Sequence, residues 1–323
     1  MVNKKLKILV IRFNSIGDII LTTPVLKVLF DAGHDVHYAM KKAYLPVLEH
    51  CPYLTNIWLL EDSFKAFGDN LKMQDFDIVV DLHNNLRSKR LKNALGKKSY
   101  TLKKDRIKSW IMTHTGFWRK PKKHIVDRFL DTVKDIAHSE NRLKVSFFHD
   151  NKPLSNSKVE LPEKYHVIAV GAAYYTKQLP NKLIADVLDH TEYPVVLIGG
   201  PEDVLNGEAI KELSHKEPIN LCGKLSIGES AKIIDGALSV VSGDTGMMHL
   251  ADALDKKLVA VFGSTHPILG YYPYNKQLTS DSIIIQNEAL HCRPCTKQGR
   301  SSCPKGHFKC MNDLDFRSIV DKM

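Results

Sequence analysis

The stretch ALSVVSGDTGMMHLA, residues 237–251, carries the strand–turn–helix pattern around which we interpret the rest of this chain. Its first five residues form an apolar run that is typical of a buried parallel strand. The residues after its second glycine favour a short helix, which Ser242, Asp244 or Thr245 can cap at a tight turn. Backbone N–H groups and the helix dipole at such a turn attract a phosphate, and His249 stays beside them on the first helical turn. An ordinary capped turn without a ligand is the alternative interpretation of this pattern.

Strand-like and helix-like segments alternate along the rest of the chain. Apolar runs that favour strands lie at residues 7–11, 36–40, 56–60, 77–82, 167–171, 194–200 and 258–263. Segments that favour helices lie between them, at residues 19–30, 44–50, 64–74, 125–136, 181–189, 208–213 and 227–235. The alternation predicts an α/β protein with two doubly wound, Rossmann-like domains that face a central cleft. We place their boundary in the polar, proline-containing stretch 138–164, which gives domains over 1–155 and 156–323.

The composition limits the class of protein. A length of 323 residues suits two domains, and 43% apolar with 25% charged residues is typical of soluble globular proteins. No apolar run approaches the roughly 18 residues of a transmembrane helix. The first apolar run ends at Arg12 and lacks the small residues of a cleavage site, so a signal peptide is not expected. We therefore expect a cytoplasmic protein.

The positive charge is concentrated in one segment. The chain carries a net charge of +10, and residues 87–123 contain 14 Lys and Arg against one acidic residue. This asymmetry predicts a face that meets a phosphorylated glycolipid, a membrane surface or nucleic acid, unless the face is only solvated. Trp110, Phe117 and Trp118 are interleaved in it, which suits a lipid interface at least as well as stacked bases.

The first strand is followed by a loop, 12–18, with a single glycine. A dinucleotide-binding turn would have the spacing G-x-G-x-x-G, so a nicotinamide dehydrogenase is disfavoured. Asp18 lies at the carboxyl end of this strand, where open α/β sheets bind ligands, and is either a functional carboxylate or an N-cap. The motif DFD at 75–77 precedes its strand, at the wrong end for a metal-dependent sugar transferase site. Residues 83–88 follow that strand and offer polar and cationic groups to a sugar or a carboxylate.

Four of the six cysteines cluster near the C-terminus, at Cys292, Cys295, Cys303 and Cys310. Four thiolates can bind zinc tetrahedrally, with His307 as a substitute ligand. In a cytosolic chain this is more plausible than disulfide bonds. Reduced or partly paired thiols are the alternative, because the second gap is shorter than in common zinc ribbons. Such a zinc would be structural, since four protein ligands leave no open position.

Five pieces of the sequence resemble one known family, in that family's order. They are SIGD at 15–18 with TTP at 22–24, DLHNNLRS at 81–88, KQLP at 177–180, GDTG at 243–246 with His249, and the cysteine-rich segment 292–311. Together they resemble the ADP-heptose:lipopolysaccharide heptosyltransferases, the family-9 glycosyltransferases with the GT-B fold. Leu179 departs from the tryptophan that is usual in the family. Residues 171–173 lack its hydroxyl-rich run.

The resemblance implies an acceptor-binding N-terminal domain and a C-terminal domain that binds the nucleotide sugar. The catalytic residues would be Asp18, as the base, and Lys177, as a contact of the diphosphate. Contacts of the donor would come from Gly17, Glu202, Asp244, Thr245, Gly246 and His249, with Glu202 at the ribose hydroxyls. Contacts of the acceptor would come from Asn85, Arg87, Ser88 and Arg128. A helix-surface arginine is the alternative for Arg128, and a histidine that only holds the turn is the alternative for His249.

These inferences predict an inverting glycosyltransferase that moves a heptose or a related sugar from an ADP-sugar to a lipopolysaccharide core acceptor. We expect no metal or cofactor in catalysis, because backbone amides and Lys177 can neutralise the diphosphate. The expected partners are the donor, an anionic glycolipid and the inner face of the cytoplasmic membrane, without nucleic acid. One alternative is another nucleotide-diphospho-sugar transferase of the cell envelope. The others are a basic nucleic-acid-binding protein and a non-catalytic glycolipid-binding protein.

Overall fold

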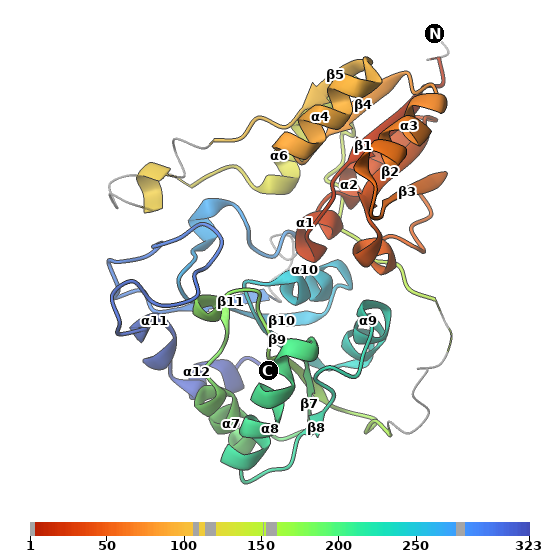
Figure 1. Cartoon of the computed structure of the whole chain (residues 1–323). Coiled ribbons are helices and arrows are strands. Elements are labelled where there is room, and N and C mark those ends of the chain that lie inside the picture. The colour runs from red at the N-terminus through yellow and green to blue at the C-terminus, as the bar shows by residue number, and fades with distance from the viewer. Residues whose placement is uncertain (1–3, 106–109, 114–120, 151, 153–159, 276–281) are drawn as a thin grey trace. The chain divides into compact units, whose positions relative to one another are not determined.

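The structure is a computed structural model, and it describes residues 4–105, 110–113, 121–150, 152, 160–275 and 282–323. It divides the chain into two compact units (Figure 1). Unit 1 contains the described residues of Met1–Asp105 and Lys123–His149. Unit 2 contains the described residues of Arg106–Lys122 and Asp150–Met323. The described part of 106–122 therefore groups with unit 2, and the expected domain boundary within 138–164 stays a prediction.

Unit 1 is built on a parallel sheet with the strand order β3-β2-β1-β4-β5. Its strands are β1 (Lys7–Ile11), β2 (Asp35–Lys41), β3 (Asn56–Leu60), β4 (Ile78–Asp81) and β5 (Lys98–Thr101). The four residues Ile8 to Ile11 of β1 are completely buried. Because successive side chains of a strand point to opposite faces, both faces of this sheet are covered.

Helices supply that cover. They are α1 (Ile16–Ile20), α2 (Thr23–Asp31), α3 (Phe64–Met73), α4 (Leu86–Leu95) and α6 (Ile125–Val133), with the 3-10 helix η1 (Lys42–Val47). Helix α3 packs against α4, and α2 packs against α6. Phe67 of α3 and Leu91 of α4 join Leu9 and Ile11 of β1 in one core cluster. The order of strands reverses between β1 and β4, and a ligand of such a sheet binds at the carboxyl ends of the strands at this reversal.

Unit 2 is built on a second parallel sheet, in the order β11-β10-β9-β6-β7-β8. Its strands are β6 (His166–Ala169), β7 (Val195–Ile198), β8 (Ile219–Asn220), β9 (Ser239–Gly243), β10 (Lys257–Phe262) and β11 (Ser282–Gln286). The central strands are buried, and Ile168, Val241 and Val259 from three of them share one core cluster. Here the order of strands reverses between β6 and β9.

The helices of unit 2 follow the same scheme. They are α7 (Asn181–His190), α8 (Val204–Leu213), α9 (Ile227–Gly236), α10 (Gly246–Ala253), α11 (Lys309–Asn312) and α12 (Phe316–Val320). Three 3-10 helices accompany them: η2 (Tyr175–Lys177), η3 (Pro201–Asp203) and η4 (Pro267–Leu269). Helix α7 packs against both α8 and α12, whereas α9 packs against α10. None of the helices in the described part of the chain is long and apolar enough to cross a membrane.

The structure corrects several expected elements. The helix expected over 19–30 is two helices, because the chain bends after α1 and Pro24 stands in the first turn of α2. Asp18 therefore lies in a helix and not in a loop. The helix expected over 44–50 is the 3-10 helix η1, which contains Pro46. Helix α4 and strand β5 were not expected, because their charged and polar sequences carry a weak periodic signal. Strand β11 was also not expected, although it contains three consecutive isoleucines.

Candidate active site

The reversal between β6 and β9 brings two loops of unit 2 together. One loop follows β6 and contains η2, and the other joins β9 to α10. Thr245 is the N-cap of α10, and its Oγ1 accepts a hydrogen bond from the backbone N–H of Met247 at 3.2 Å. The Ser242 hydroxyl lies 3.1 Å from that Oγ1 and donates to the Gly243 carbonyl at 3.0 Å. The cap therefore fixes the start of α10, whose N–H groups and dipole favour an anion.

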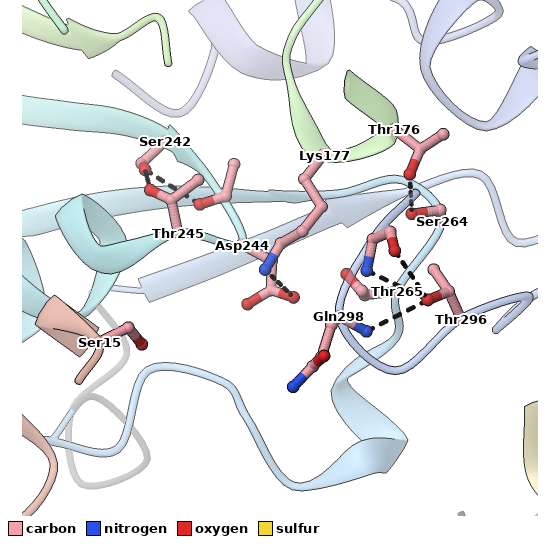
Figure 2. A network of polar contacts seen from close by, with 12 residues as sticks. Ser15, Thr176, Lys177, Ser242, Asp244, Thr245, Ser264, Thr265, Thr296 and Gln298 are labelled. Carbon is pink, nitrogen blue, oxygen red and sulfur yellow. Dashed lines mark hydrogen bonds and ion pairs between the residues drawn. The ribbon is translucent and has the colours of Figure 1, made fainter. Parts of the chain in front are cut away.

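Lys177 lies against this turn. Its Nζ atom is 3.1 Å from Oδ2 of Asp244, and the two side chains are 16% and 10% exposed (Figure 2). An ammonium has three donors, and this ion pair uses one of them. The Lys177 backbone is equally close, because a Cβ atom on Gly243 would stand 2.5 Å from the Lys177 carbonyl oxygen. Lys177, Asp244, Thr245 and Gly246, which the sequence analysis assigned to the donor, thus lie together.

The other two expected donor contacts of unit 2 differ in burial. His249 of α10 is 5% exposed, so most of its ring packs within unit 2. Glu202 is exposed in η3, directly after β7, and its carboxylate lies over Gly200, where a Cβ atom would be 2.5 Å from Oε2. The next residue, Asp203, is buried, and its Oδ2 accepts a hydrogen bond from the Gly200 N–H at 2.8 Å. Burial raises the pKa of Asp203.

Polar contacts of Thr176, the residue before Lys177, hold the loop that carries both residues. The Thr176 hydroxyl accepts hydrogen bonds from the Ser264 hydroxyl at 2.9 Å and from the Arg300 N–H at 2.8 Å (Figure 2). Ser264 follows β10, and Arg300 belongs to the cysteine-rich segment. Sequence reasoning missed this network, because the three residues are far apart in the chain and carry no periodic signal.

Arg293 ties the cysteine-rich segment to the ends of two strands. Its guanidinium donates to the carbonyl oxygens of Phe262, Gly263 and Thr265 after β10. It also donates to the Asn287 carbonyl and to Oε1 of Gln286, at 3.1 and 3.0 Å, at the end of β11. Burial lowers the pKa of this guanidinium. Arg293 therefore fixes the loop that carries Ser264. Because the Ser264 hydroxyl donates to Thr176, this loop also helps to hold Thr176, the residue before Lys177.

The four cysteines of this segment are free thiols, and no disulfide joins them. Burial raises the pKa of Cys295, and Cys292 and Cys303 raise it further because they are nearby groups of the same charge. Burial also raises the pKa of Cys310, to about 11. Among the residues that the structure describes, no group of three or more His, Cys, Asp or Glu side chains is placed to hold a metal ion. The zinc site therefore stays a prediction.

In unit 1, the reversal between β1 and β4 brings Asp18 and the loop after β4 to one edge of the sheet. The guanidinium of Arg12 forms an ion pair with Oδ2 of Asp18, and the Ser15 hydroxyl donates to the same oxygen at 3.1 Å. The Asp18 side chain is 22% exposed. Arg12 also donates to the Leu82 carbonyl at 3.0 Å, so it links the two loops. Gly17 is buried in α1 beside this carboxylate.

The loop after β4 is organised by the buried Asp81. Its Oδ1 accepts from the N–H groups of His83 and Asn84, and its Oδ2 accepts from the Ser88 hydroxyl at 2.9 Å. Asn85 and Ser88 form the capping box of α4, with hydrogen bonds of 2.8 and 3.0 Å. Ser88 is completely buried and helps to shape this loop, and its expected contact with the acceptor stays a prediction.

The expected cationic contacts of the acceptor differ in their surroundings. Arg87 is exposed on the first turn of α4. Arg128, in contrast, donates to the Lys103 carbonyl at 2.5 Å and lies 3.9 Å from Oδ2 of Asp105, with a side chain that is 13% exposed. It therefore secures the segment after β5. Trp110 is 59% exposed, whereas Phe117 and Trp118 lie outside the described residues.

Comparison with known proteins identifies relatives over the whole chain. The chain is 25% identical to lipopolysaccharide heptosyltransferase 1 of Pseudomonas aeruginosa over 336 aligned positions, which cover 96% of this chain and 91% of that protein. It is 31% identical to lipooligosaccharide heptosyltransferase 2 of Haemophilus influenzae over 144 residues, or 43% of this chain and 39% of that protein. The second match thus spans less than half of the relative's length.

Solved structures show the same fold. A glycosyl transferase of family 9 from Veillonella parvula superimposes with a TM-score of 0.78 at 18% identity, over 100% of this chain and 97% of that one. The ADP-heptose lipopolysaccharide heptosyltransferase II of Escherichia coli superimposes with a TM-score of 0.74 at 18% identity, over 98% and 97%. The predicted GT-B fold is confirmed. Residues 64–304 match the model of glycosyltransferase family 9 (heptosyltransferase), and the chain therefore belongs to this family of glycosyltransferases.

Proposed function

We propose that the chain is an inverting, metal-independent heptosyltransferase that moves a heptose from ADP-heptose to a lipopolysaccharide core acceptor. One observation carries the proposal: Lys177, Asp244 and the capped start of α10 lie together at the strand reversal of unit 2. This is the edge where an open α/β sheet binds its ligand, and its groups suit a diphosphate. Membership of the heptosyltransferase family supports the sugar class. The name of the Escherichia coli neighbour supports ADP-heptose as the donor.

The donor diphosphate would bind at the start of α10. Lys177 would place its ammonium against the phosphate oxygens, and the N–H groups in the first turn of α10 other than that of Met247, which bonds to Thr245, would donate to them. This arrangement would stabilise the negative charge that develops as the diphosphate leaves, without a metal ion. Glu202, exposed after β7, would accept from the ribose hydroxyls. His249 would keep the helix in place from the buried side.

Asp18 would be the base. The Arg12 guanidinium beside it favours the ionised carboxylate, which is the form that accepts a proton. In the reaction, the acceptor oxygen forms a bond to the anomeric carbon and the bond from that carbon to the phosphate oxygen breaks. Asp18 takes the hydroxyl proton and ADP leaves with the electron pair. A single displacement of this kind inverts the anomeric centre.

Arg87 and Asn85, with the remaining cations of α4, would meet the anionic groups of the acceptor. Arg128 would act indirectly, by holding the chain after β5. Because the acceptor is a glycolipid, we place the enzyme at the inner face of the cytoplasmic membrane as a peripheral protein. The exposed cations of α4 would then lie near anionic lipid groups.

The test of the base is Asp18→Asn, with Asp31→Asn as a control. Asp31 is an exposed unit 1 carboxylate, paired with Lys27 on α2, and has no part in the proposed site. We expect Asp18→Asn to fold and to lower turnover by about a hundredfold or more, the usual scale for a general base. Asp31→Asn should retain normal turnover. Near-normal turnover of a folded Asp18→Asn protein would remove Asp18 from the role.

Metal dependence is tested separately for catalysis and for the cysteines. Transfer should continue in a chelator, and loss of activity that magnesium or manganese restores would contradict the account of the α10 turn. Elemental analysis of protein purified without chelator tests the zinc hypothesis. One zinc per chain, lost in Cys295→Ser, would support a structural site at the four cysteines.

The nucleotide is tested by thermal stabilisation, because a ligand that binds only the folded state raises its stability. We expect ADP to raise the Tm more than UDP or GDP at the same concentration. A preference for UDP or GDP would favour another cell-envelope sugar transferase of the same fold. Binding to DNA or RNA that persists in moderate salt, without any response to nucleotides, would favour the nucleic-acid alternative.

A further inference from the structure

His83 lies at the strand reversal of unit 1, two residues after the end of β4. Its backbone N–H donates to Oδ1 of Asp81 at 3.0 Å, which fixes the main chain. Its ring lies 5.7 Å from the ring of Phe13, in the loop after β1. The side chain is 9% exposed. The residue is therefore held rigidly at the same edge of the sheet as Asp18.

One hydrogen bond determines which ring nitrogen of His83 carries the proton. Nδ1 accepts from the backbone N–H of Phe13 at 3.1 Å. An amide N–H can only donate, so Nδ1 is the unprotonated nitrogen of the ring. The neutral imidazole then carries its proton on Nε2, and Nε2 is a hydrogen-bond donor.

The charge of His83 is also fixed. Burial, with a smaller contribution from the nearby cations of Arg12, Lys104 and Arg87, lowers its pKa to about 3, while Asp18 acts in the opposite direction. The ring is therefore neutral at any pH at which a cytoplasmic enzyme works. His83 cannot serve as a base, because the lone pair of Nδ1 is occupied, and it cannot serve as a cation.

Nε2 remains available for a ligand. It makes no hydrogen bond to any residue in the part of the chain that the structure describes. It is also not one of the buried polar atoms without a partner in that part, so it keeps contact with solvent. A donor of fixed tautomer and fixed position beside the Asp18–Arg12 pair suits an oxygen atom of a bound sugar.

We propose that the Nε2–H group of His83 donates a hydrogen bond to an oxygen atom of the acceptor saccharide and so helps to select and orient it. The inference rests on the proposed function in one respect, which is that the acceptor binds to unit 1. Asp18 would accept from the attacking hydroxyl, whereas His83 would donate to a different oxygen, either a hydroxyl or a carboxylate. His83 is thus a specificity-determining residue and takes no proton in the reaction.

Two substitutions separate this role from a structural one. In His83→Asn, the amide can replace Nδ1 as the acceptor of the Phe13 N–H, but nothing replaces Nε2. In His83→Gln, the longer amide can place its NH₂ group near the position of Nε2, but the bond from Phe13 is lost. If His83 binds the acceptor, Asn should weaken binding more than Gln does. If His83 only supports the loop, the order should be reversed.

Binding of a deacylated lipopolysaccharide core that lacks heptose should be measured by calorimetry, with ADP present at saturation. We expect His83→Asn to raise the Kd about tenfold, the scale of one lost hydrogen bond, and His83→Gln to stay within about threefold of the unmodified protein. The KM for the donor should change in neither variant. The control is His166→Asn, which alters a buried histidine of unit 2 whose Nδ1 lies 2.8 Å from the Ser239 hydroxyl. It should leave binding of the saccharide unchanged.

Nitrogen NMR of the imidazole gives a second measurement, with His83 assigned by its loss in His83→Gln. We expect the Nε2-protonated neutral ring in the free protein and a downfield Nε2–H signal when the core saccharide is added. Protonation on Nδ1, no response of the ring to the saccharide, or equal binding by His83→Asn and the unmodified protein would overturn the proposal. Saccharide binding that depends on His83, in a protein that transfers no heptose from ADP-heptose, would support the role of His83 and contradict the proposed donor.

Discussion

Replacing Gly243 by alanine should damage the donor site by adding one methyl group. Gly243 is the last residue of β9, directly before Asp244. The new Cβ atom would stand 2.5 Å from the Lys177 carbonyl oxygen and 3.4 Å from Cδ1 of Leu179. The first of these neighbours is backbone, so rotation of a side chain cannot relieve the contact. The loop that carries Lys177 must move away from the end of β9.

The size of the movement follows from these distances. Ordinary contacts of a Cβ atom begin at 3.4 Å, so a contact at 2.5 Å requires a retreat of about 0.9 Å. Overpacking of this kind costs about 1–3 kcal/mol in the free energy of unfolding. A displacement of about 1 Å in a group that positions a substrate can cost up to about a hundredfold in rate. We therefore expect the Kd for ADP to rise about tenfold and turnover to fall by about ten- to a hundredfold.

The control is the same substitution at Gly228, in the first turn of α9, where a Cβ atom would meet nothing within 4 Å. Gly228→Ala should be neutral or should stabilise the protein by up to about 1 kcal/mol, because alanine favours the helix. Calorimetry with ADP, urea denaturation and a transfer assay on both variants provide the comparison. If Gly243→Ala binds ADP and turns over like Gly228→Ala, the close approach of the Lys177 backbone is not part of donor binding.

Two other predictions concern buried groups. The pKa of His83 is about 3 in the folded protein and about 6.5 in the unfolded chain. Between these pH values the unfolded state binds a proton that the folded state does not bind. The free energy of unfolding therefore falls as the pH falls from 6.5 towards 3. Urea titrations should show a loss on the order of 1 kcal/mol per pH unit that His83→Asn lacks, and parallel pH profiles of the two proteins would contradict this. Arg293→Met should lower the free energy of unfolding by about 3 kcal/mol or more, because several backbone carbonyls lose their hydrogen-bond donor. Arg293→Lys should recover only part of this lost stability. Equal denaturation midpoints for Arg293→Lys and the unmodified protein would refute the bonding scheme.

The positions of most strands, though not of β5 and β11, and of their carboxyl ends could be predicted from the sequence, and with them much of the candidate site. The run from Ile8 to Ile11 is apolar and mostly β-branched, and each residue in it is buried. The turn after β9 carries glycine, a carboxylate and a hydroxyl, which are the residue types that such a turn requires. These signals are local, because they depend on residues a few positions apart. They led to Asp244, Thr245 and Gly246 without knowledge of the tertiary structure.

Contacts between distant residues could not be predicted in this way. The Nδ1 atom of His83 meets the backbone of Phe13 across 70 positions, and the Thr176 hydroxyl meets Arg300 across 124 positions. No periodicity indicates such a pair, since either residue would look ordinary in its own segment. The burial of Ser88 was not predicted for the same reason, because it follows from the position of Asp81 and not from the neighbours of Ser88 in sequence.

In each unit, one charged residue of the candidate site is paired with a side chain of opposite charge, and this pairing affects how the residue can act. In unit 1 the carboxylate of Asp18 is paired with Arg12, and in unit 2 the ammonium of Lys177 is paired with Asp244. Each partner is partly buried, so a bare charge at either position would lose hydration without compensation. The pair in unit 2 can exchange its carboxylate for phosphate oxygens, because both are anions of similar hydrogen-bonding capacity. The pair in unit 1 has a different consequence, since Arg12 also donates to the Leu82 carbonyl and would keep its position in the proposed reaction, in which Asp18 accepts from a hydroxyl. Lys177 is therefore suited to bind a ligand anion, and Asp18 to act on a neutral hydroxyl from a fixed position.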